Sequence, residues 1–383
     1  MTAPRNIVVC LDGTNNSPAD ARTHVQRLYR LIEKSSAQLT YYQPGVGTLE
    51  PIGVLGPLRR RALMGLDSGS GWMLQRHVSA AYQFLSDVYR EGDRLYLFGF
   101  SRGAYSVRVL AGMLATVGLL HPGMREMVAF AWQAYESLPA FPPQADAASP
   151  RRQQALRDYF RRIRSFRKSY SRRVPVHFLG LWDTVSSVGL PWLPRVYSHT
   201  ASNPIVATVR HAVALDEHRG NFVQNLWTPK PSPKQDVREV WFAGGHGDVG
   251  GGYPTGGRDI ELARIPLAWM LREAEAAGLL TDAQARAEAG LPDLSDDEAM
   301  QRFALAPRHD EIHHWLWQLS ERLPIPRWSQ SADGRWERHW RPHHARARTL
   351  RPGALVHESV YQRLRLCSAY RPSNLRDDVV LVR

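Results

Sequence analysis

One short motif constrains this chain more than any other feature: a serine between two glycines, placed directly after an apolar run and directly before a helical pattern. The motif reads Gly99-Phe100-Ser101-Arg102-Gly103; it follows the run Leu95–Phe98 and precedes the pattern Ala104–Leu114. Strand, sharp turn and helix in this order predict a nucleophile elbow, in which a strained turn pushes the serine hydroxyl out over the sheet edge. Ser101 is therefore the candidate nucleophile. The alternative is an ordinary turn serine flanked by glycines.

Strand-like segments alternate with helical patterns along the chain. The expected strands are Asn6–Leu11, Arg94–Phe100, Val176–Trp182 and Val237–Ala243. The clearest helical patterns are Arg22–Ser35, Trp72–Tyr89, Ala104–Leu114 and Ile260–Ala277. This alternation predicts an α/β fold with a mainly parallel sheet and helices on both of its faces. Most of the strands are near-continuous apolar runs, which is typical of strands covered on both sides.

The residues that a serine nucleophile needs follow the later strands. A serine hydroxyl requires an imidazole as base and a carboxylate that orients the imidazole. Asp183 ends the third expected strand, and His246 follows the fourth within a glycine-rich segment. Ligands of parallel sheets bind at the carboxyl ends of the strands, so this order predicts Ser101 as nucleophile, His246 as base and Asp183 as acid.

Other residues compete for two of these roles. Asp248 and Asp216 are alternative acids, and His211, His218 and His357 are alternative bases. His357 is the most serious competitor because it lies late in the chain. Position at a strand end favours Asp183 and His246, and the glycines around His246 permit close approach of a substrate or of another backbone segment.

An ester hydrolase also needs two N–H donors for the oxyanion of the transition state. One donor comes from the residue after the nucleophile, which is Arg102. The other is expected from the loop after the first strand, at Gly13 or Thr14, with Asp12 holding that loop by hydrogen bonds. Asp248 is expected to be a further supporting residue of the site. The alternative for this loop is a turn of purely structural role.

The length of 383 residues allows one large domain, and we interpret residues 1–383 as a single domain with two inserted segments. Residues 121–173 form the first, a basic helical cap. Residues 281–352 form the second, which is rich in tryptophan and arginine. Both are expected to cover the site.

The formal charge of +13 indicates an acidic partner. Between Arg151 and Arg173 there are ten Lys or Arg against the single acid Asp158. Basic residues around Tyr159, Phe160, Ile163 and Phe166 suit the head groups of an anionic bilayer. Nucleic acid is the less favoured partner, and a solvated helix face is the alternative to both.

Several other classes of protein lack their signature here. Cys10 stands where a haloacid-dehalogenase phosphatase needs its nucleophilic aspartate, and no phosphate-binding loop with its lysine is present. The two cysteines give no disulfide framework or metal-ligand spacing, and the chemistry of a serine nucleophile needs no cofactor. No signal-peptide core and no apolar run of bilayer length occurs, so we expect a soluble chain made in the cytoplasm.

A set of motifs in a fixed order resembles a known family. The motifs are Leu11-Asp12-Gly13-Thr14-Asn15, Gln43-Pro44-Gly45-Val46-Gly47-Thr48, Gly99-Phe100-Ser101-Arg102-Gly103-Ala104-Tyr105, Trp182-Asp183-Thr184-Val185, Ala214-Leu215-Asp216-Glu217-His218-Arg219 and His246-Gly247-Asp248-Val249-Gly250-Gly251-Gly252-Tyr253. They are similar to those of the α/β-hydrolase domain of type VI secretion phospholipase effectors, over most of residues 5 to 270.

The resemblance implies a fold, an activity and a set of partners. It implies an α/β-hydrolase fold, hydrolysis of membrane phospholipids, and a triad of Ser101, Asp183 and His246. It further implies a bacterial antibacterial effector, exported by type VI secretion, that meets an immunity or secretion-apparatus protein. The alternatives are an esterase of the same fold that acts on small or non-lipid esters, and a non-enzymatic protein that binds nucleic acid or an anionic surface.

Overall fold

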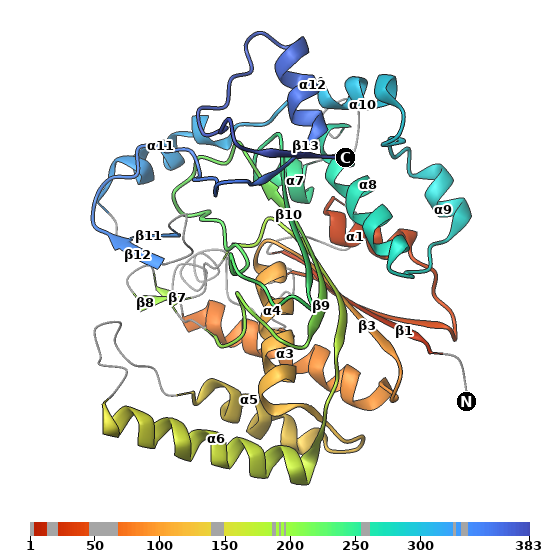
Figure 1. Ribbon diagram of the computed structural model, residues 1–383, viewed down its shortest axis with the longest axis vertical. Coiled ribbons are helices and arrows are strands. Elements are labelled where there is room, and N and C mark those ends of the chain that lie inside the picture. The colour runs from red at the N-terminus through yellow and green to blue at the C-terminus, as the bar shows by residue number, and fades with distance from the viewer. Residues whose placement is uncertain are drawn as a thin grey trace, which may run out of the picture.

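A parallel sheet forms the centre of the protein (Figure 1). The computed structural model describes residues 4–13, 22–45, 68–138, 149–185, 189–190, 193–194, 197–253, 261–324, 327–330 and 336–383. Within these residues eight strands form one sheet in the order β14-β13-β10-β9-β6-β3-β1-β2, and every neighbouring pair is parallel. The predicted sheet is confirmed. Its strands are β1 (Asn6–Leu11), β2 (Gln38–Gln43), β3 (Arg94–Phe100), β6 (Val176–Trp182), β9 (Val206–Ala214), β10 (Asp236–Phe242), β13 (Leu355–His357) and β14 (Val380–Val382).

Helices cover both faces of this sheet (Figure 1). One face carries α3 (Ser68–Val88), α4 (Arg102–Val117), α5 (Val128–Glu136) and α6 (Pro150–Tyr170). The other carries α1 (His24–Leu31), α8 (Glu261–Ala276), α9 (Ala283–Glu288), α10 (Asp297–Ala304) and α12 (Glu358–Leu366). The other helices of the described ranges are α7 (His246–Gly250), α11 (Trp315–Arg322) and the short 3-10 turns η1 (Arg125–Met127) and η3 (Glu311–His313). Short antiparallel pairs join β4 (Leu119–Leu120) to β5 (Ser171–Arg172), β7 (Gly189–Leu190) to β8 (Leu193–Pro194), and β11 (Arg327–Gln330) to β12 (Trp336–His339).

The alternation of side chains along β1 explains why its sequence is continuously apolar. Ile7 and Val9 pack into the core under α3 and α4, whereas Val8 and Cys10 pack into the core under α1 and α8. All four side chains are fully buried because both faces of the strand are covered. Burial also raises the pKa of the Cys10 thiol, so this cysteine stays neutral and packs as an apolar side chain.

Four of the eight strands were not expected from the sequence. Strand β9 escapes detection because Arg210 and His211 interrupt its apolar pattern. Arg210 lies 2.5 Å from both Asp236 and Glu273, and His211 lies 2.8 Å from Glu239, so the polar groups are paired within the fold. Strand β2 lies at the sheet edge and is half-buried, and β13 and β14 have three residues each. Short or half-polar strands give weak periodicity.

Helix α6 forms an outer layer on the α4 side of the sheet (Figure 1). Tyr159 and Ile163 are buried in the same core as α4 and α5. Among the described residues, none of the hydrogen bonds given for the side chains of Ser101, Asp183 and His246 involves α6. The cap role of residues 121–173 therefore stays a prediction.

The later inserted segment contributes to two different places. Helix α10 packs Met300 and Phe303 into the core near α8 and α12. In contrast, Trp317 of α11 and Arg348 lie at the carboxyl edge of the sheet, where Trp317 contacts Phe222 and Arg348 binds Asp183. Only the second part of this segment reaches the predicted site.

Candidate active site

Ser101 lies at a sharp turn between β3 and α4. Its backbone φ is 58°, in the left-handed region that residues other than glycine rarely adopt. A Cβ at Gly99 would collide with the backbone of Gly103, and a Cβ at Gly103 would collide with the backbone of Leu11. Close approach of the backbone therefore requires both flanking glycines, which is the local geometry of a nucleophile elbow.

The serine, histidine and aspartate predicted from three strand ends lie together. His246 Nε2 lies 2.9 Å from Ser101 Oγ, and His246 Nδ1 lies 2.5 Å from Asp183 Oδ2. With Nδ1–H donating to the carboxylate, Nε2 is the nitrogen that accepts from the serine hydroxyl. The three groups form one continuous hydrogen-bonded chain, which is the arrangement that can remove a proton from a serine nucleophile.

Two aromatic rings hold the imidazole of His246. The ring centroid of Phe100 lies 4.6 Å from that of His246, and the ring centroid of Phe222 lies 4.9 Å from it on an edge-on contact. A Cβ at Gly250 would overlap the Phe100 ring, so the glycine-rich segment after β10 lets this ring lie beside the histidine. Ser101 and His246 are only 8% and 7% exposed, which lowers the local dielectric and strengthens their hydrogen bond.

Asp183 is fully buried and receives hydrogen bonds from three different parts of the chain. The Ala214 N–H donates to Oδ1 at 3.0 Å, and Arg348 binds both oxygens, with Nη1 2.6 Å from Oδ1 and Nη2 3.0 Å from Oδ2. Burial raises the pKa of the carboxyl, but the charge of Arg348 and the hydrogen bond from His246 outweigh burial. The pKa of Asp183 therefore lies well below its ordinary value, and the group is a carboxylate at neutral pH.

Arg348 was not predicted as a site residue from the sequence. It is one of many arginines in the stretch from Arg335 to Arg351, and it lies 165 positions from Asp183. The one signal in the sequence for this segment is its high density of arginines, which does not distinguish Arg348 from its neighbours. Asp183 also has a positive φ of 36°, so both Ser101 and Asp183 have strained backbones, which in proteins cluster at functional sites.

Glu217 is a second buried carboxylate beside the histidine, and no role was predicted for it from the sequence. Its Oε2 accepts the backbone N–H of His246 at 3.1 Å. Arg219 binds both oxygens of Glu217, at 2.8 and 2.7 Å. Burial raises the pKa of Glu217, but the hydrogen bond and charge of Arg219 lower it more. This ion pair fixes the start of α7 and hence the position of the imidazole.

The predicted oxyanion donors have different surroundings. Arg102 is the first residue of α4, so its N–H is one of the helix N-terminal donors without an acceptor inside the helix. The Gly13 N–H donates to Asp12 Oδ1 at 2.6 Å, so service as an oxyanion donor requires this hydrogen bond to be shared or broken. Thr14 lies outside the described residues. All three oxyanion roles stay predictions.

Asp12, just after β1, accepts hydrogen bonds from two other segments, and its role in holding the loop stays a prediction. Its Oδ2 accepts the hydroxyls of Thr23 at 2.7 Å and Tyr42 at 3.0 Å. Gly103 approaches the backbone of Leu11 and Asp12 so closely that a Cβ would collide with it. The backbone of Leu11 and Asp12 is thereby packed closely against the helix that follows Ser101.

Asp248 supports the histidine segment from within α7. Its carboxylate accepts the N–H of Gly245 at 3.0 Å and the N–H of His309 at 3.1 Å, and the His309 ring lies 2.7 Å from Oδ1. These contacts join α7 to the later inserted segment. Asp248 therefore binds the backbone N–H of Gly245, next to His246, and does not bind the His246 ring.

The competing residues make other contacts. The Asp216 carboxylate accepts the Gly244 N–H and the Tyr370 hydroxyl, and His211 accepts the Thr184 N–H. His357 is fully buried, caps the first turn of α12 and stacks on Phe242, and burial lowers its pKa to about 3. His218 is half-buried. Among the described histidines, His246 is the one hydrogen-bonded to Ser101.

In the ranges that the structure describes, no group of three or more His, Cys, Asp or Glu side chains is arranged to hold a metal ion. None of the helices in the same ranges is both long enough and apolar enough to cross a membrane.

Two solved structures resemble this chain over 79% of its length. One is an uncharacterized protein from Pseudomonas aeruginosa, with a TM-score of 0.44, 18% identity and 50% of that chain covered. The other is the Tle1 effector bound to the VgrG spike of the type VI secretion system, with a TM-score of 0.42, 15% identity and 79% of that chain covered.

Sequence comparison finds a protein of higher identity to this chain than these two structures. The chain is 41% identical over 238 residues to the uncharacterized protein YEL023C of Saccharomyces cerevisiae, an alignment that covers 59% of this chain and 33% of the yeast protein. This chain thus spans a third of that relative's length. The family model for the catalytic domain of Tle1-like phospholipase effectors of the type VI secretion system (T6SS) matches residues 5–273. The chain therefore belongs to the Tle1-like phospholipase effector family of the type VI secretion system and contains its catalytic domain.

Proposed function

We propose that this protein is a serine esterase that hydrolyses the acyl esters of membrane phospholipids. The observation that carries the proposal is the unbroken hydrogen-bonded chain from the Ser101 hydroxyl through His246 to the buried Asp183 carboxylate. Membership of a phospholipase family supports the substrate class. Within that family the role of a type VI secretion antibacterial effector, with an immunity protein or a secretion-apparatus protein as partner, is part of the same proposal.

The reaction follows the geometry of the site. Ser101 Oγ bonds to the ester carbonyl carbon while its proton passes to His246 Nε2. The negative charge on the carbonyl oxygen is stabilised by the Arg102 N–H and a donor of the Gly13–Thr14 loop. The ester C–O bond then breaks, and the leaving alcohol oxygen takes the proton from His246. Water then attacks the carbonyl carbon of the acyl-enzyme while His246 Nε2 takes a proton from it. The bond from this carbon to Ser101 Oγ breaks, Oγ receives the proton from His246, and the fatty acid and the free serine are released.

Asp183 acts through His246, and Arg348 acts through Asp183. The carboxylate keeps the proton on Nδ1 in the resting state and stabilises the imidazolium that forms when Nε2 is protonated. Arg348 holds the carboxylate in the plane that meets Nδ1, because its fork contacts both oxygens. Arg348 is thus a positioning residue.

The test is product analysis by mass spectrometry after incubation with a panel of phospholipids, neutral glycerides and short-chain esters. We expect fatty acid and lysophospholipid as products. Ser101→Ala should remain folded and lose activity by about 10³-fold or more, because the triad acts as a unit. Near wild-type turnover by pure Ser101→Ala would contradict the serine mechanism.

The same panel decides between the alternatives. Hydrolysis of small esters with no hydrolysis of any phospholipid would indicate a general esterase. Absence of hydrolysis, together with salt-dependent binding of DNA, would indicate a nucleic-acid-binding protein.

A further inference from the structure

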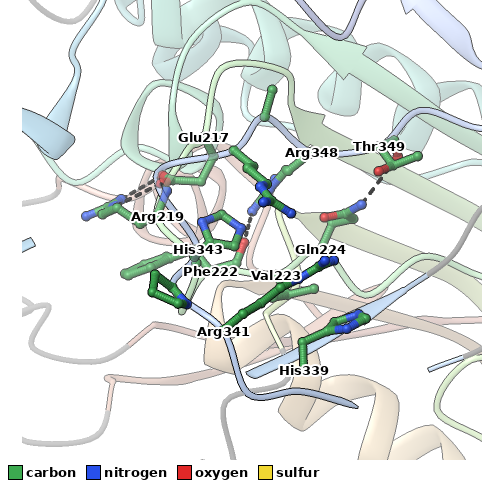
Figure 2. A pocket seen from close by; sticks show the side chains of 14 residues that line it. Glu217, Arg219, Phe222, Val223, Gln224, His339, Arg341, His343, Arg348 and Thr349 are labelled. Atoms are coloured by element: carbon green, nitrogen blue, oxygen red, sulfur yellow. Dashed lines mark hydrogen bonds and ion pairs between the residues drawn. The ribbon is translucent and has the colours of Figure 1, made fainter. Parts of the chain in front are cut away.

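A pocket lies between the loop after β9 and the segment before β13 (Figure 2). Its walls come from residues 217–224 and 339–349, and its volume is about 190 Å³. A single water needs only about 15 Å³ by the same kind of measure. The pocket is therefore large enough for a group of several heavy atoms.

Two lining residues also contact the proposed triad. The Phe222 ring lines the pocket and lies 4.9 Å from the His246 ring, measured between centroids. Arg348 lines the pocket and binds Asp183. One side chain thus separates the pocket from the histidine, and one separates it from the aspartate.

The lining of the pocket is strongly basic. It contains the four arginines Arg219, Arg341, Arg346 and Arg348 and the two histidines His339 and His343, against the single carboxylate of Glu217.

These charges are not all neutralised within the described structure. Arg219 neutralises Glu217, and Arg348 neutralises Asp183. Arg341 and Arg346 are exposed, and neither has an ion pair with another described residue. Two positive charges therefore face the pocket in excess, and such a site favours an anion that several arginines can bind together.

The direction of the reaction places the two halves of an ester relative to His246. His246 gives its proton to the leaving oxygen, so the alcohol half of the substrate lies on the histidine side of Ser101. In a glycerophospholipid the alcohol half carries the phosphate. We propose that this pocket binds the phosphodiester group of the alcohol half, an inference that rests on the proposed function and assigns part of the substrate to named residues.

The first experiment compares two soluble esters with the same acyl chain. Monomeric dihexanoylphosphatidylcholine contains the phosphodiester, and p-nitrophenyl hexanoate does not. Arg341→Gln/Arg346→Gln should raise KM for the phospholipid about tenfold and leave kcat/KM for the p-nitrophenyl ester within about twofold, because it removes charge-assisted contacts to phosphate alone. Both arginines are exposed, so the variant should fold normally.

The matched control removes the same charge elsewhere. Lys234→Gln/Arg365→Gln takes away two exposed positive charges, one before the amino end of β10 and one on α12. It should behave as wild type with both esters. An unchanged phospholipid KM in Arg341→Gln/Arg346→Gln, an equal loss with both esters, or an equal loss in the control would each overturn the assignment of the pocket.

The second experiment measures binding without turnover. Glycerophosphocholine, which lacks acyl esters, is titrated into the protein and observed by ³¹P NMR. Wild type should bind it, and Arg341→Gln/Arg346→Gln should bind about tenfold more weakly. If inorganic phosphate at the same concentration displaces it equally well, the pocket takes free phosphate and the assignment to lipid is wrong.

The two experiments separate this inference from the proposed function. Hydrolysis of the p-nitrophenyl ester with no binding of glycerophosphocholine would leave the serine esterase standing and overturn the pocket. Binding of glycerophosphocholine that needs both arginines, with no hydrolysis of either ester, would contradict the esterase and support the phosphodiester site.

Discussion

Asp183 shows how a single buried carboxylate is kept charged. It accepts hydrogen bonds from the Ala214 N–H, the His246 ring and both terminal nitrogens of Arg348, and it has no exposure to solvent. A buried ion pair of this kind adds little net stability, but removal of one partner leaves an uncompensated charge. Loss of Arg348 should therefore leave the buried charge of Asp183 without its ion-pair partner.

Arg348→Gln should lower both stability and turnover. Loss of the guanidinium should cost about 3 kcal/mol in the free energy of unfolding and reduce kcat for p-nitrophenyl hexanoate about tenfold or more, with little change in KM, because the residue acts through Asp183. Arg348→Lys restores the charge without the fork and should recover part of kcat. Urea unfolding and steady-state kinetics measure both effects. A change in KM alone would contradict the positioning role.

His246 and His357 can be separated by substitution. His246→Ala should abolish ester hydrolysis while the protein stays folded, because it removes the base bonded to Ser101. His357→Asn should keep activity, because His357 serves as the N-cap of α12 and asparagine caps helices well. The measurements are ester hydrolysis and circular dichroism. Loss of activity in folded His357→Asn with retained activity in His246→Ala would reverse the assignment.

Helix α6 presents two different faces. Tyr159 and Ile163, which the sequence analysis grouped with the arginines as a bilayer surface, are buried against the core beside α4, and Phe166 is partly buried there. Phe160 is 48% exposed and remains on the outer face. Arg164, Arg167, Lys168, Arg172 and Arg173 gather around one surface depression at the end of the helix. The surface offered to a membrane is thus mostly basic, with few apolar groups.

Replacement of Arg161, Arg162, Arg164 and Arg167 by Gln should weaken binding to anionic vesicles. Each positive charge near such a surface contributes on the order of 1 kcal/mol, so the loss should amount to several kcal/mol. Vesicle sedimentation with and without phosphatidylglycerol measures the effect, and hydrolysis of p-nitrophenyl hexanoate should be spared. Equal loss of activity on vesicles and on the soluble ester would indicate damage to the fold, and no loss on either would make α6 a solvated face.

At the scale of the whole molecule, buried neutral histidines make stability depend on pH. Burial lowers the pKa of His357 from 6.5 to about 3 in the folded state. As the pH falls, the unfolded chain therefore binds the proton before the folded protein does. The titration of His357 thus lowers the free energy of unfolding as the pH falls from 6.5 to about 3. At higher pH the group is neutral in both states and contributes no pH dependence.

His357→Asn should reduce the acid sensitivity of the fold. The slope contributed by one proton is about 1.4 kcal/mol per pH unit, so the variant should lose about 2 kcal/mol less than wild type when the pH is lowered from 6.5 to 5. Urea unfolding at the two pH values, analysed by linear extrapolation, measures the difference. Parallel losses in the two proteins would contradict the assignment of this titration to His357.

Local patterns in the sequence determined much of the fold. Strands β1, β3 and β6 have the predicted bounds because each is an apolar run that ends in a turn, and β10, whose first half is mostly polar, is shifted by one residue. Parallel strands end at one edge of the sheet, so the sequence also indicated that Ser101, Asp183 and His246 lie near one another. Their catalytic roles stay predictions until the variants are measured.

The tertiary structure alone decided which polar groups meet. Strand β9 contains Arg210 and His211, whose burial depends on partners in other segments, and a local pattern does not reveal such partners. The roles of Arg348 and Glu217 were not predicted for the same reason. The sequence does not show which distant group a charged side chain will contact once the chain has folded. Apolar periodicity is a local property that repeats along each element, whereas the pairing of a buried charge selects one partner across the whole molecule.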